Sequence, residues 1–318
     1  MANSPPNPAP ARRRWALVAL LVAGVIVALA LVGESVVVTA VTMGRRLVTG
    51  GTLHWSDGAS AWAEVPLATE LRRLWGPGDR FLSPRYTTAA DGLGVAELQF
   101  LRPPDPRAVK LVLLDVDPAR WNLRVWGRAD WSRGEVADLA EEGGMSWAVN
   151  GPYFAEDGPL GLVVSDGVVR NRQGSTRAAH FLGDRAGARP RIVNERRTSV
   201  VGIQQGFQGF PAIMSGRRTF GYLRTGGRGF SISEVERRTA ACLDDRGHLL
   251  LMATDTWTSG LSLAELATIL GGLGCVDAMA FDGGASTALW LDVPGTRRHI
   301  DGFDGVPVIL GASPLAAE

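Results

Sequence analysis

The residues with the clearest chemical potential follow the apolar, strand-like segment AMAF. There the chain reads Asp282-Gly283-Gly284-Ala285-Ser286-Thr287. Glycines let the backbone turn sharply and approach a ligand closely. A strand-end carboxylate followed by glycines and hydroxyls can place backbone N–H groups and the Ser286 side chain around an anionic oxygen. The pattern suits a phosphate-type ligand, although Asp-Gly-Gly after a strand is also an ordinary turn sequence.

A second group of polar and aromatic residues follows the buried, strand-like segment SWAV. It reads Asn150-Gly151-Pro152-Tyr153-Phe154. An amide at the end of a strand can hydrogen-bond a sugar hydroxyl, and the aromatic side chains can pack on a sugar ring. Asn-Gly-Pro is equally typical of a plain turn, so this motif alone does not decide between a binding role and a structural one.

Two arginines and one further carboxylate complete the candidates. Arg177, in STRAAHF, and Arg238, in ERRTAACL, each precede a strand-like run. A planar guanidinium can hold a phosphate bidentately, but a solvated surface arginine fits the same positions. Asp255 closes the run LLLMATD. It is therefore a second strand-end carboxylate, or else a residue that caps a helix or turn.

Short apolar or alternating runs, separated by polar or proline-rich turns, predict the strands that must position these residues. The runs lie at about 95–101, 109–117, 121–127 and 146–151. Turn sequences predict three hairpins, which are centred on Asp166-Gly167, Asp184 to Gly187 and Asp245 to Gly247. Hairpins of this kind predict antiparallel pairing in place of a doubly wound parallel sheet.

Two helices are predicted between these strands. In GEVADLAEEGG, the residues Val136, Leu139 and Ala140 share one face before a glycine pair ends the helix. In LSLAELATILGGLG, Ser262 is a candidate N-cap, and Glu265 three residues later completes a capping box. The fold class that follows is α+β, a mixed and hairpin-rich sheet with a few packed helices.

The N-terminus carries a strong membrane signal. Residues 15–33 contain no charged side chain and are about long enough to cross a bilayer core, and apolar residues continue to Met43. Arg12 to Arg14 precede this stretch and predict a cytoplasmic N-terminus. A cleaved signal peptide ending near Ala30 is the competing interpretation. We therefore expect a disordered cytoplasmic tail, a single transmembrane anchor and a stalk or cap segment, at 1–14, 15–43 and 44–94.

Composition limits the partners and cofactors. Lysine plus arginine (33) nearly balances aspartate plus glutamate (32), so no summed positive field favours nucleic acid. No zinc-type pair is formed by the histidines, which are His54, His180, His248 and His299. No metal site is assigned, although clustered carboxylates leave calcium or magnesium open. Cys242 and Cys275 lie in apolar contexts, which favours buried free thiols over a single disulfide.

The order and content of these motifs resemble the phosphodiester glycosidase family over about Val95 to Leu310. The family's Asn-Gly-x-Tyr/Phe-Phe segment is matched by Asn150 to Phe154, and its Asp-Gly-Gly-Gly-Ser signature by Asp282 to Ser286. Supporting matches are the hairpin Gly161 to Gly167, the segment Gly206 to Arg217, Arg238-Thr239 and Asp255. Ala285 replaces the third glycine of the signature, and its methyl group could narrow a turn that needs positive φ or close ligand approach.

The resemblance implies a hydrolase that breaks the bond between an anomeric carbon and a phosphate. Phosphate is already a good leaving group, with a second pKa of about 6. The site must mainly supply a carboxylate, which activates water or stabilises an oxocarbenium-like transition state, and groups that hold the phosphate oxygens. The expected carboxylate is Asp282, with Asp255 second. The expected substrate-binding residues are Asn150, Gly151, Tyr153, Arg177, Arg238, Gly283, Gly284, Ser286 and Thr287.

The expected protein is a membrane-anchored, extracytoplasmic glycosidase whose catalytic domain covers 95–318. Its expected partners are a glycan or sugar-phosphate substrate from the envelope or an exopolysaccharide, and the lipid bilayer through residues 15–43. No cofactor is expected. Two alternatives stay open: a non-catalytic glycan-binding accessory protein of exopolysaccharide assembly, and a metal-dependent phosphodiesterase that acts on the phosphate.

Overall fold

The computed structural model describes the chain from Leu53 to Leu315 with several gaps. The described residues are 53–65, 74–103, 107–174, 179–186, 188–195, 197–219 and 234–315. The predicted tail at 1–14 and membrane anchor at 15–43 lie outside them. Within these ranges no helix combines the length and the apolar character needed to span a bilayer.

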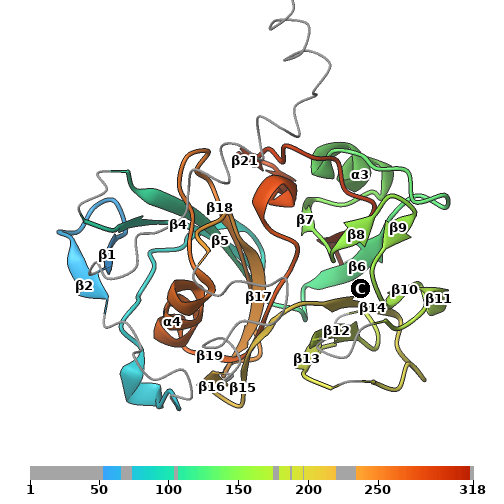
Figure 1. Cartoon of the computed structure of the whole chain (residues 1–318), viewed down its shortest axis with the longest axis horizontal. Helices are drawn as coiled ribbons and strands as arrows, with labels where there is room; N and C mark the ends of the chain where they lie inside the picture. The colour runs from blue at the N-terminus through green and yellow to red at the C-terminus, as the bar shows by residue number, and fades with distance from the viewer. Residues whose placement is uncertain are drawn as a thin grey trace, which may run out of the picture. The chain divides into compact units, whose positions relative to one another are not determined.

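The largest sheet has ten strands, and its described strand pairs are all antiparallel. In spatial order it runs β16 (Arg218–Thr219), β15 (Ala212–Ser215), β19 (Cys275–Ala280), β17 (Thr239–Asp244), β18 (Leu249–Thr254), β5 (Val109–Val116), β4 (Leu93–Leu101), β1 (Leu53–Ser56) and β2 (Ala63–Val65). Strand β3 (Thr87–Ala90) pairs with β4 off this path. Figure 1 shows these strands beside α4.

Two five-stranded sheets and one two-stranded ribbon form the rest of the β structure. One sheet is ordered β11 (Val168–Asn171), β10 (Val163–Ser165), β14 (Gln205–Gly209), β12 (Ala179–Gly183) and β13 (Arg191–Val193). The other is ordered β21 (Thr296–Ile300), β20 (Leu289–Val293), β7 (Trp147–Asn150), β22 (Ile309–Pro314) and β6 (Trp121–Trp126). The ribbon pairs β8 (Phe154–Ala155) with β9 (Gly158–Pro159). Antiparallel pairing throughout agrees with the predicted hairpin-rich sheet.

The described residues contain two α-helices, α3 (Val136–Glu142) and α4 (Leu263–Leu273), and both are where the sequence predicts them. In α4 the Ser262 hydroxyl accepts a hydrogen bond from the Glu265 N–H, and the Glu265 carboxylate accepts one from the Ser262 N–H. This reciprocal capping satisfies two backbone groups that the first helical turn leaves unpaired. Two short 3₁₀ turns, Pro77–Asp79 and Gly284–Ser286, complete the helical structure described.

The large sheet is buried on both faces because its strands are apolar on both sides. Leu111 of β5 belongs to the hydrophobic cluster that contains Leu266 of α4. The next residue, Val112, belongs to the cluster that contains Trp147 of β7 and Phe207 of β14. Successive strand residues point to opposite faces, so α4 covers one face and the two five-stranded sheets cover the other (Figure 1).

All three predicted hairpins are present. Strands β10 and β11 meet at Asp166-Gly167, where both residues have the positive φ that a tight two-residue turn requires. Strands β12 and β13 pair across the second turn, and β17 and β18 pair across the third. The described part of the expected stalk or cap segment, 44–94, also joins the large sheet, because β1 and β3 each pair with β4.

The expectation of two free thiols is wrong. Cys242 of β17 and Cys275 of β19 form a disulfide, with 5.8 Å between their Cα atoms. The two strands are hydrogen-bonded neighbours, which brings their side chains within the range that a disulfide needs. Both cysteines are fully buried, so the apolar sequence context that suggested inert thiols reflects the burial of the bridge.

Candidate active site

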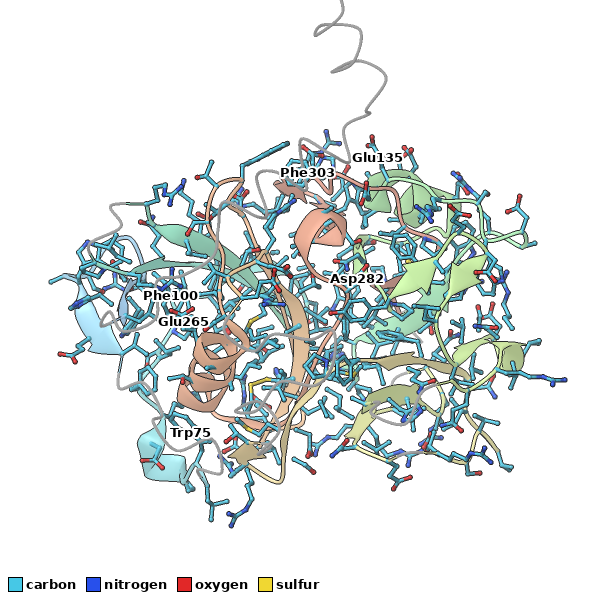
Figure 2. All side chains as sticks on the ribbon, in the orientation of Figure 1. Trp75, Phe100, Glu135, Glu265, Asp282 and Phe303 are labelled. Carbon is cyan, nitrogen blue, oxygen red and sulfur yellow. A yellow bond between two sulfur atoms is a disulfide. The ribbon has the colours of Figure 1, made fainter. Side chains whose placement is uncertain are left out.

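Asp282 lies where the large sheet meets the sheet of β7 and β20. It follows β19, and the N–H of the preceding Phe281 donates to the Thr239 carbonyl at the start of β17, at 2.9 Å. The Asp282 N–H donates across the junction to the carbonyl of Gly151, which follows β7, at 3.1 Å. The two principal motifs of the sequence are therefore joined through the backbone at Asp282, which Figure 2 labels.

Asn150 fixes this junction with its side chain. Its amide N–H donates to the Asp282 carbonyl at 2.7 Å, and its amide oxygen accepts from the Thr239 hydroxyl at 2.6 Å and from the Ala288 N–H at 3.1 Å. The residue is fully buried. The sequence suggested that Asn150 binds a sugar hydroxyl, but the structure places it beneath the site. It holds the backbone around Asp282.

The glycine loop after Asp282 differs from the expected anion cradle. The Gly283 N–H donates to the Asp282 carboxylate at 3.0 Å, the Gly284 N–H to the Arg237 carbonyl at 2.9 Å, and the Ser286 N–H to the Gly283 carbonyl at 3.2 Å. Because these three donors already have partners, they do not form an open nest for phosphate. The loop instead shapes and orients the carboxylate.

The alanine in the signature does not strain this loop. Gly284 has a φ of +60°, in the left-handed region that favours glycine, whereas Ala285 is not among the described non-glycine residues with positive φ. The residue that needs positive φ is thus Gly284, and the alanine that departs from the family pattern follows it. The Ala285 carbonyl also has a role, because it accepts the Phe303 N–H at 2.6 Å and so ties the loop before β22 to the motif.

The Asp282 carboxyl has a raised pKa, whereas the other described carboxyls with a resolved shift have lowered ones. Burial raises its pKa to about 6, against the lowering effects of hydrogen bonds from the Ser286 hydroxyl and the Gly283 N–H. The negative charges of Glu236 and Asp304 raise it further. A carboxyl with a pKa near neutrality, at the end of a strand and beside other ionisable groups, is a candidate general base or acid.

Charged and phenolic groups from three segments surround this carboxyl. The field acting on the Tyr153 phenol comes from Asp282, Arg238 and Glu236, and burial raises the pKa of Tyr153, so its hydroxyl stays protonated. Glu236 lies 3.5 Å from the Arg238 guanidinium. Three carboxylates, one guanidinium and one phenol therefore share the site, with Asp304 as the third carboxylate.

The Arg238 guanidinium already donates hydrogen bonds within the protein, so it is less available than an arginine that is free to bind phosphate. Its Nε donates to the Leu261 carbonyl at 2.9 Å and its Nη2 to the Glu234 carbonyl at 2.7 Å. Nη1 lies on the Gly283 side, 3.8 Å from where a Cβ of that glycine would stand. Arg238 thus contributes a fixed positive charge to the site and one nitrogen that is directed toward it.

The remaining candidates fall in different places. Arg177 lies outside the described residues. Thr287 is fully buried, and its hydroxyl has no hydrogen-bond partner among the described residues. Gly151 is buried, and a Cβ there would stand 2.7 Å from the Val308 carbonyl oxygen, so this glycine is required by backbone packing. Asp255 is exposed at the end of β18, and it is not among the groups that shift the pKa of Asp282.

Two acidic residues of the site were missed from the sequence. Glu236 stands two positions before Arg238 in the quoted segment ERRTAACL, so a search for carboxylates beside the candidate arginine would have found it. Asp304 belongs to the loop DGFDG between β21 and β22. No local pattern connects that loop with Asp282, because its contact depends on the hydrogen bond between Phe303 and Ala285.

The described residues hold no cluster of three or more histidine, cysteine, aspartate or glutamate side chains arranged for a metal ion. Each histidine belongs to a different segment. The described positions are His54 in β1, His180 in β12, His248 before β18 and His299 in β21.

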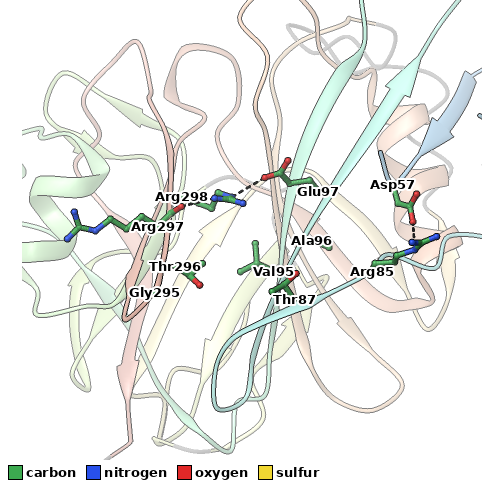
Figure 3. A pocket seen from close by; sticks show the side chains of 10 residues that line it. All are labelled: Asp57, Arg85, Thr87, Val95, Ala96, Glu97, Gly295, Thr296, Arg297 and Arg298. Atoms are coloured by element: carbon green, nitrogen blue, oxygen red, sulfur yellow. Dashed lines mark hydrogen bonds and ion pairs between the residues drawn. The ribbon is translucent and has the colours of Figure 1, made fainter. Parts of the chain in front are cut away.

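A separate cleft of about 430 Å³ opens between β4 and the β20–β21 hairpin (Figure 3). Arg298 reaches across it to Glu97 at 3.0 Å, and Arg85 pairs with Asp57 at 2.8 Å on the other side. Gly295, at the turn of the hairpin, lines the cleft. The loop of Asp282 joins the opposite end of the same hairpin, about 17 Å away at the usual strand rise. The cleft is therefore distinct from the Asp282 site.

Solved structures share this fold. The catalytic domain of zebrafish N-acetylglucosamine-1-phosphodiester alpha-N-acetylglucosaminidase, auto-inhibited by its pro-peptide, superposes with a TM-score of 0.57 at 20% identity, covering 76% of this chain and 92% of that one. A hypothetical protein from Synechocystis gives a TM-score of 0.54 at 15% identity and covers 73% of this chain. This chain spans 64% of the length of the Synechocystis protein.

Sequence comparison agrees with the structural likeness. No curated protein matches the chain. The family model for phosphodiester glycosidases matches residues 143–312, which is more than half of the 318 residues and includes both Asn150 and the Asp282 loop. The chain therefore belongs to the phosphodiester glycosidase family.

Proposed function

We propose that this protein hydrolyses the bond between a sugar's anomeric carbon and a phosphodiester, with Asp282 as the catalytic carboxylate. The observation that carries the proposal is the half-buried Asp282 carboxyl, whose pKa is raised to about 6 within the family's signature loop. A base is most effective when its pKa lies near the working pH. Family membership supports the glycosidase class, and the charges around Asp282 support the choice of residue.

In the proposed reaction, water attacks the anomeric carbon and passes a proton to the ionised Asp282 carboxylate. The bond between the anomeric carbon and the phosphate oxygen breaks, and the phosphate monoester leaves with the bonding electrons. It needs little protonation because phosphate is a good leaving group. The Asp282 carboxylate is oriented by hydrogen bonds from the Ser286 hydroxyl and the Gly283 N–H. We assign the departing phosphate to the Tyr153 hydroxyl and the positive charge of Arg238, and their mutual influence within the site supports this assignment.

We further propose that the protein is anchored by residues 15–43 and works outside the cytoplasm on envelope or exopolysaccharide glycans. The apolar N-terminal stretch supports the anchor. The Cys242–Cys275 disulfide supports an oxidising compartment, since such bonds are rare in the cytosol. The topology is tested by adding protease to intact cells that carry the full-length chain. We expect the domain to be digested from outside, and a domain that stays protected in the cytoplasm overturns the proposed location.

The activity is tested on the full-length chain with a panel of sugar 1-phosphodiesters in water enriched in oxygen-18, with and without added calcium or magnesium. The variant Asp282→Asn keeps the size of the side chain and removes the base. Arg298→Ala, in the separate cleft, is the matched control. We expect sugar release by the wild type and by Arg298→Ala, and loss of release in Asp282→Asn that still melts cooperatively.

The position of the label separates the alternatives. Oxygen-18 in the released sugar identifies attack at the anomeric carbon and supports the glycosidase. Oxygen-18 in the phosphate means that water attacks phosphorus, and the protein is then a phosphodiesterase instead of a glycosidase. If the diesters bind but are not turned over, the protein is a glycan-binding accessory protein instead of a glycosidase. Undiminished turnover by Asp282→Asn overturns the assignment of the catalytic residue.

A further inference from the structure

A buried ion pair joins the end of β4 to the start of α4. Arg102, the residue that follows β4, donates from Nε to one oxygen of the Glu265 carboxylate at 2.7 Å and from Nη2 to the other oxygen at 2.6 Å. Glu265 belongs to the first turn of α4 (Figure 2). Arg102 is 5% exposed and Glu265 is 7% exposed. The fold has removed both charges from water, so each of them needs the other.

The ion pair holds the backbone on both sides of Leu261. The Arg102 guanidinium donates from Nη2 to the Gly260 carbonyl at 3.3 Å, and the Glu265 carboxylate accepts the Ser262 N–H at 2.8 Å. The Ser262 hydroxyl also donates to that carboxylate, at 2.9 Å. All three residues of this segment are buried. The ion pair therefore fixes a buried segment whose middle residue is Leu261.

Leu261 in turn holds two charged residues of the candidate active site. Its N–H donates to the Glu236 carbonyl at 2.8 Å, and its carbonyl accepts the Glu236 N–H at 3.3 Å and the Arg238 Nε at 2.9 Å. The contact is close, because a Cβ on Gly260 would stand 2.1 Å from the Glu236 carbonyl oxygen. The negative charge of Glu236 acts on the Asp282 carboxyl. A displacement of Leu261 therefore moves charges that surround this carboxyl.

The capping of α4 does not by itself explain the buried ion pair. A capping box needs a hydroxyl at Ser262 and a carboxylate or amide at position 265, so glutamine serves there as glutamate does. Arg102 takes no part in the capping box. Replacing a buried ion pair by well-packed neutral residues is often neutral or stabilising for a fold. Helix stability therefore gives little reason for the two charges, whereas their hydrogen bonds on both sides of Leu261 do.

We propose that Arg102 and Glu265 are positioning residues of the reaction. Their ion pair fixes Leu261, and Leu261 fixes the charges of Glu236 and Arg238 beside the catalytic carboxyl. This inference rests on the proposed function and extends the site to two residues that act through the backbone of a third. Arg102 precedes the residues 143–312 that the family model matches, so the ion pair couples the catalytic region to a strand outside that match.

The test replaces the ion pair by neutral residues in the full-length chain, as Arg102→Met with Glu265→Gln. Glutamine keeps the capping box, and no unpaired charge is left in the interior. We expect this pair variant to melt cooperatively and its kcat for a sugar 1-phosphodiester to fall by about 10- to 100-fold. The rise of kcat/KM with pH should move to lower pH by about 0.5 to 1 pH unit, because Glu236 is released toward solvent and acts less on Asp282.

Two controls separate positioning from a general loss of stability. Arg124→Met with Asp166→Asn removes an ion pair between β6 and the β10–β11 turn, and it should change neither kcat nor the pH of the rise. In a chain that already carries Glu236→Gln, the pair variant should cause no further shift to lower pH, because the charge that it displaces is absent. A purely structural role of the ion pair predicts no shift in either chain.

A measurement without turnover keeps this result distinct from a failure of the proposed reaction. The difference in Tm between each chain and the same chain with Asp282→Asn, followed from pH 4 to pH 8, reports the pKa of Asp282. Asp304, Tyr153 and Arg238, the other ionisable groups at the site, are unchanged in every chain. A lower pKa of Asp282 in the pair variant, but not in the Glu236→Gln background, supports positioning even if no sugar is released.

An unchanged pKa of Asp282 in the folded pair variant, or an equal shift in the Glu236→Gln background, overturns the inference even if hydrolysis is found. If the pair variant does not melt cooperatively, Arg102→Lys carries the same comparison. Lysine keeps the charge opposite Glu265 but cannot reproduce the fixed, two-pronged contact of the guanidinium. A smaller shift in the same direction then supports positioning, and no shift overturns it.

Discussion

The raised pKa of Asp282 predicts that its ionised carboxylate destabilises the folded protein at neutral pH. Its pKa rises from 3.8 in a model compound to about 6 in the fold. Such a group contributes most to stability below its unfolded pKa, and the contribution is lost as pH rises through the folded pKa. A shift of this size corresponds to about 3 kcal/mol in the free energy of unfolding between pH 4 and pH 8.

The variant Asp282→Asn removes the charge and keeps the shape. Its amide oxygen can still accept the Gly283 N–H, and its amide nitrogen can donate to the Ser286 hydroxyl. We expect the variant to be nearly as stable as the wild type at pH 4 and more stable by about 3 kcal/mol above pH 7. For a domain of this size, that difference raises the Tm by about 6 to 12 °C.

Differential scanning calorimetry of the full-length chain from pH 4 to pH 8 checks this expectation. Asp166→Asn serves as a control of opposite sign, because the Arg124 guanidinium lowers the pKa of Asp166. That control should lose stability relative to the wild type as pH rises, and asparagine tolerates the positive φ of the turn. If the Tm of Asp282→Asn runs parallel to that of the wild type across this range, burial does not destabilise the ionised carboxylate and the pKa of Asp282 is not raised.

Three further changes test the site and its support. In a pH series, kcat/KM should rise through about pH 6 as Asp282 ionises. Glu236→Gln removes a negative charge and should move this rise in kcat/KM to lower pH. A rise at an unchanged pH contradicts the effect of Glu236 on the pKa of Asp282. Asn150→Ala leaves a buried hydroxyl and a backbone N–H without partners, and should cost about 2–4 kcal/mol in denaturant unfolding and about 100-fold in kcat. Replacing both Cys242 and Cys275 by alanine opens a loop of 33 residues and should cost about 4 kcal/mol relative to the oxidised wild type in urea unfolding, and the reduced wild type should lose a similar amount.

The elements that the sequence predicted well are those in which local patterns agree with the tertiary fold. The capping residues Ser262 and Glu265 mark the start of α4, and the Asp166-Gly167 turn marks a hairpin. Both signals depend on hydrogen bonds or φ angles within a few residues. The motif containing Asp282 could likewise be found from its residues, because the glycine that takes positive φ stands within it, at Gly284.

Predictions that depended on exposure or on contacts distant in sequence were less successful. Asn150 was interpreted as a sugar ligand because an amide at a strand end is normally accessible, but the neighbouring sheet covers it. Cys242 and Cys275 were interpreted as thiols because their separate contexts cannot reveal that β17 and β19 are neighbours. Glu236 could have been found from its place two residues before Arg238. Its importance comes from its position beside Asp282, which the strand order determines.

The charges assembled at the site favour attack on the sugar carbon over attack on phosphorus. Glu236 and Asp304 add negative charge beside Asp282, and Arg238 is the fixed cation that acts with them. An oxocarbenium-like transition state carries positive charge on the sugar ring, which nearby carboxylates stabilise. Attack on phosphorus needs cations around the phosphate oxygens to offset its charge, and a cluster of three carboxylates opposes it. The same carboxylates that raise the pKa of Asp282 thus favour the glycosidase reaction.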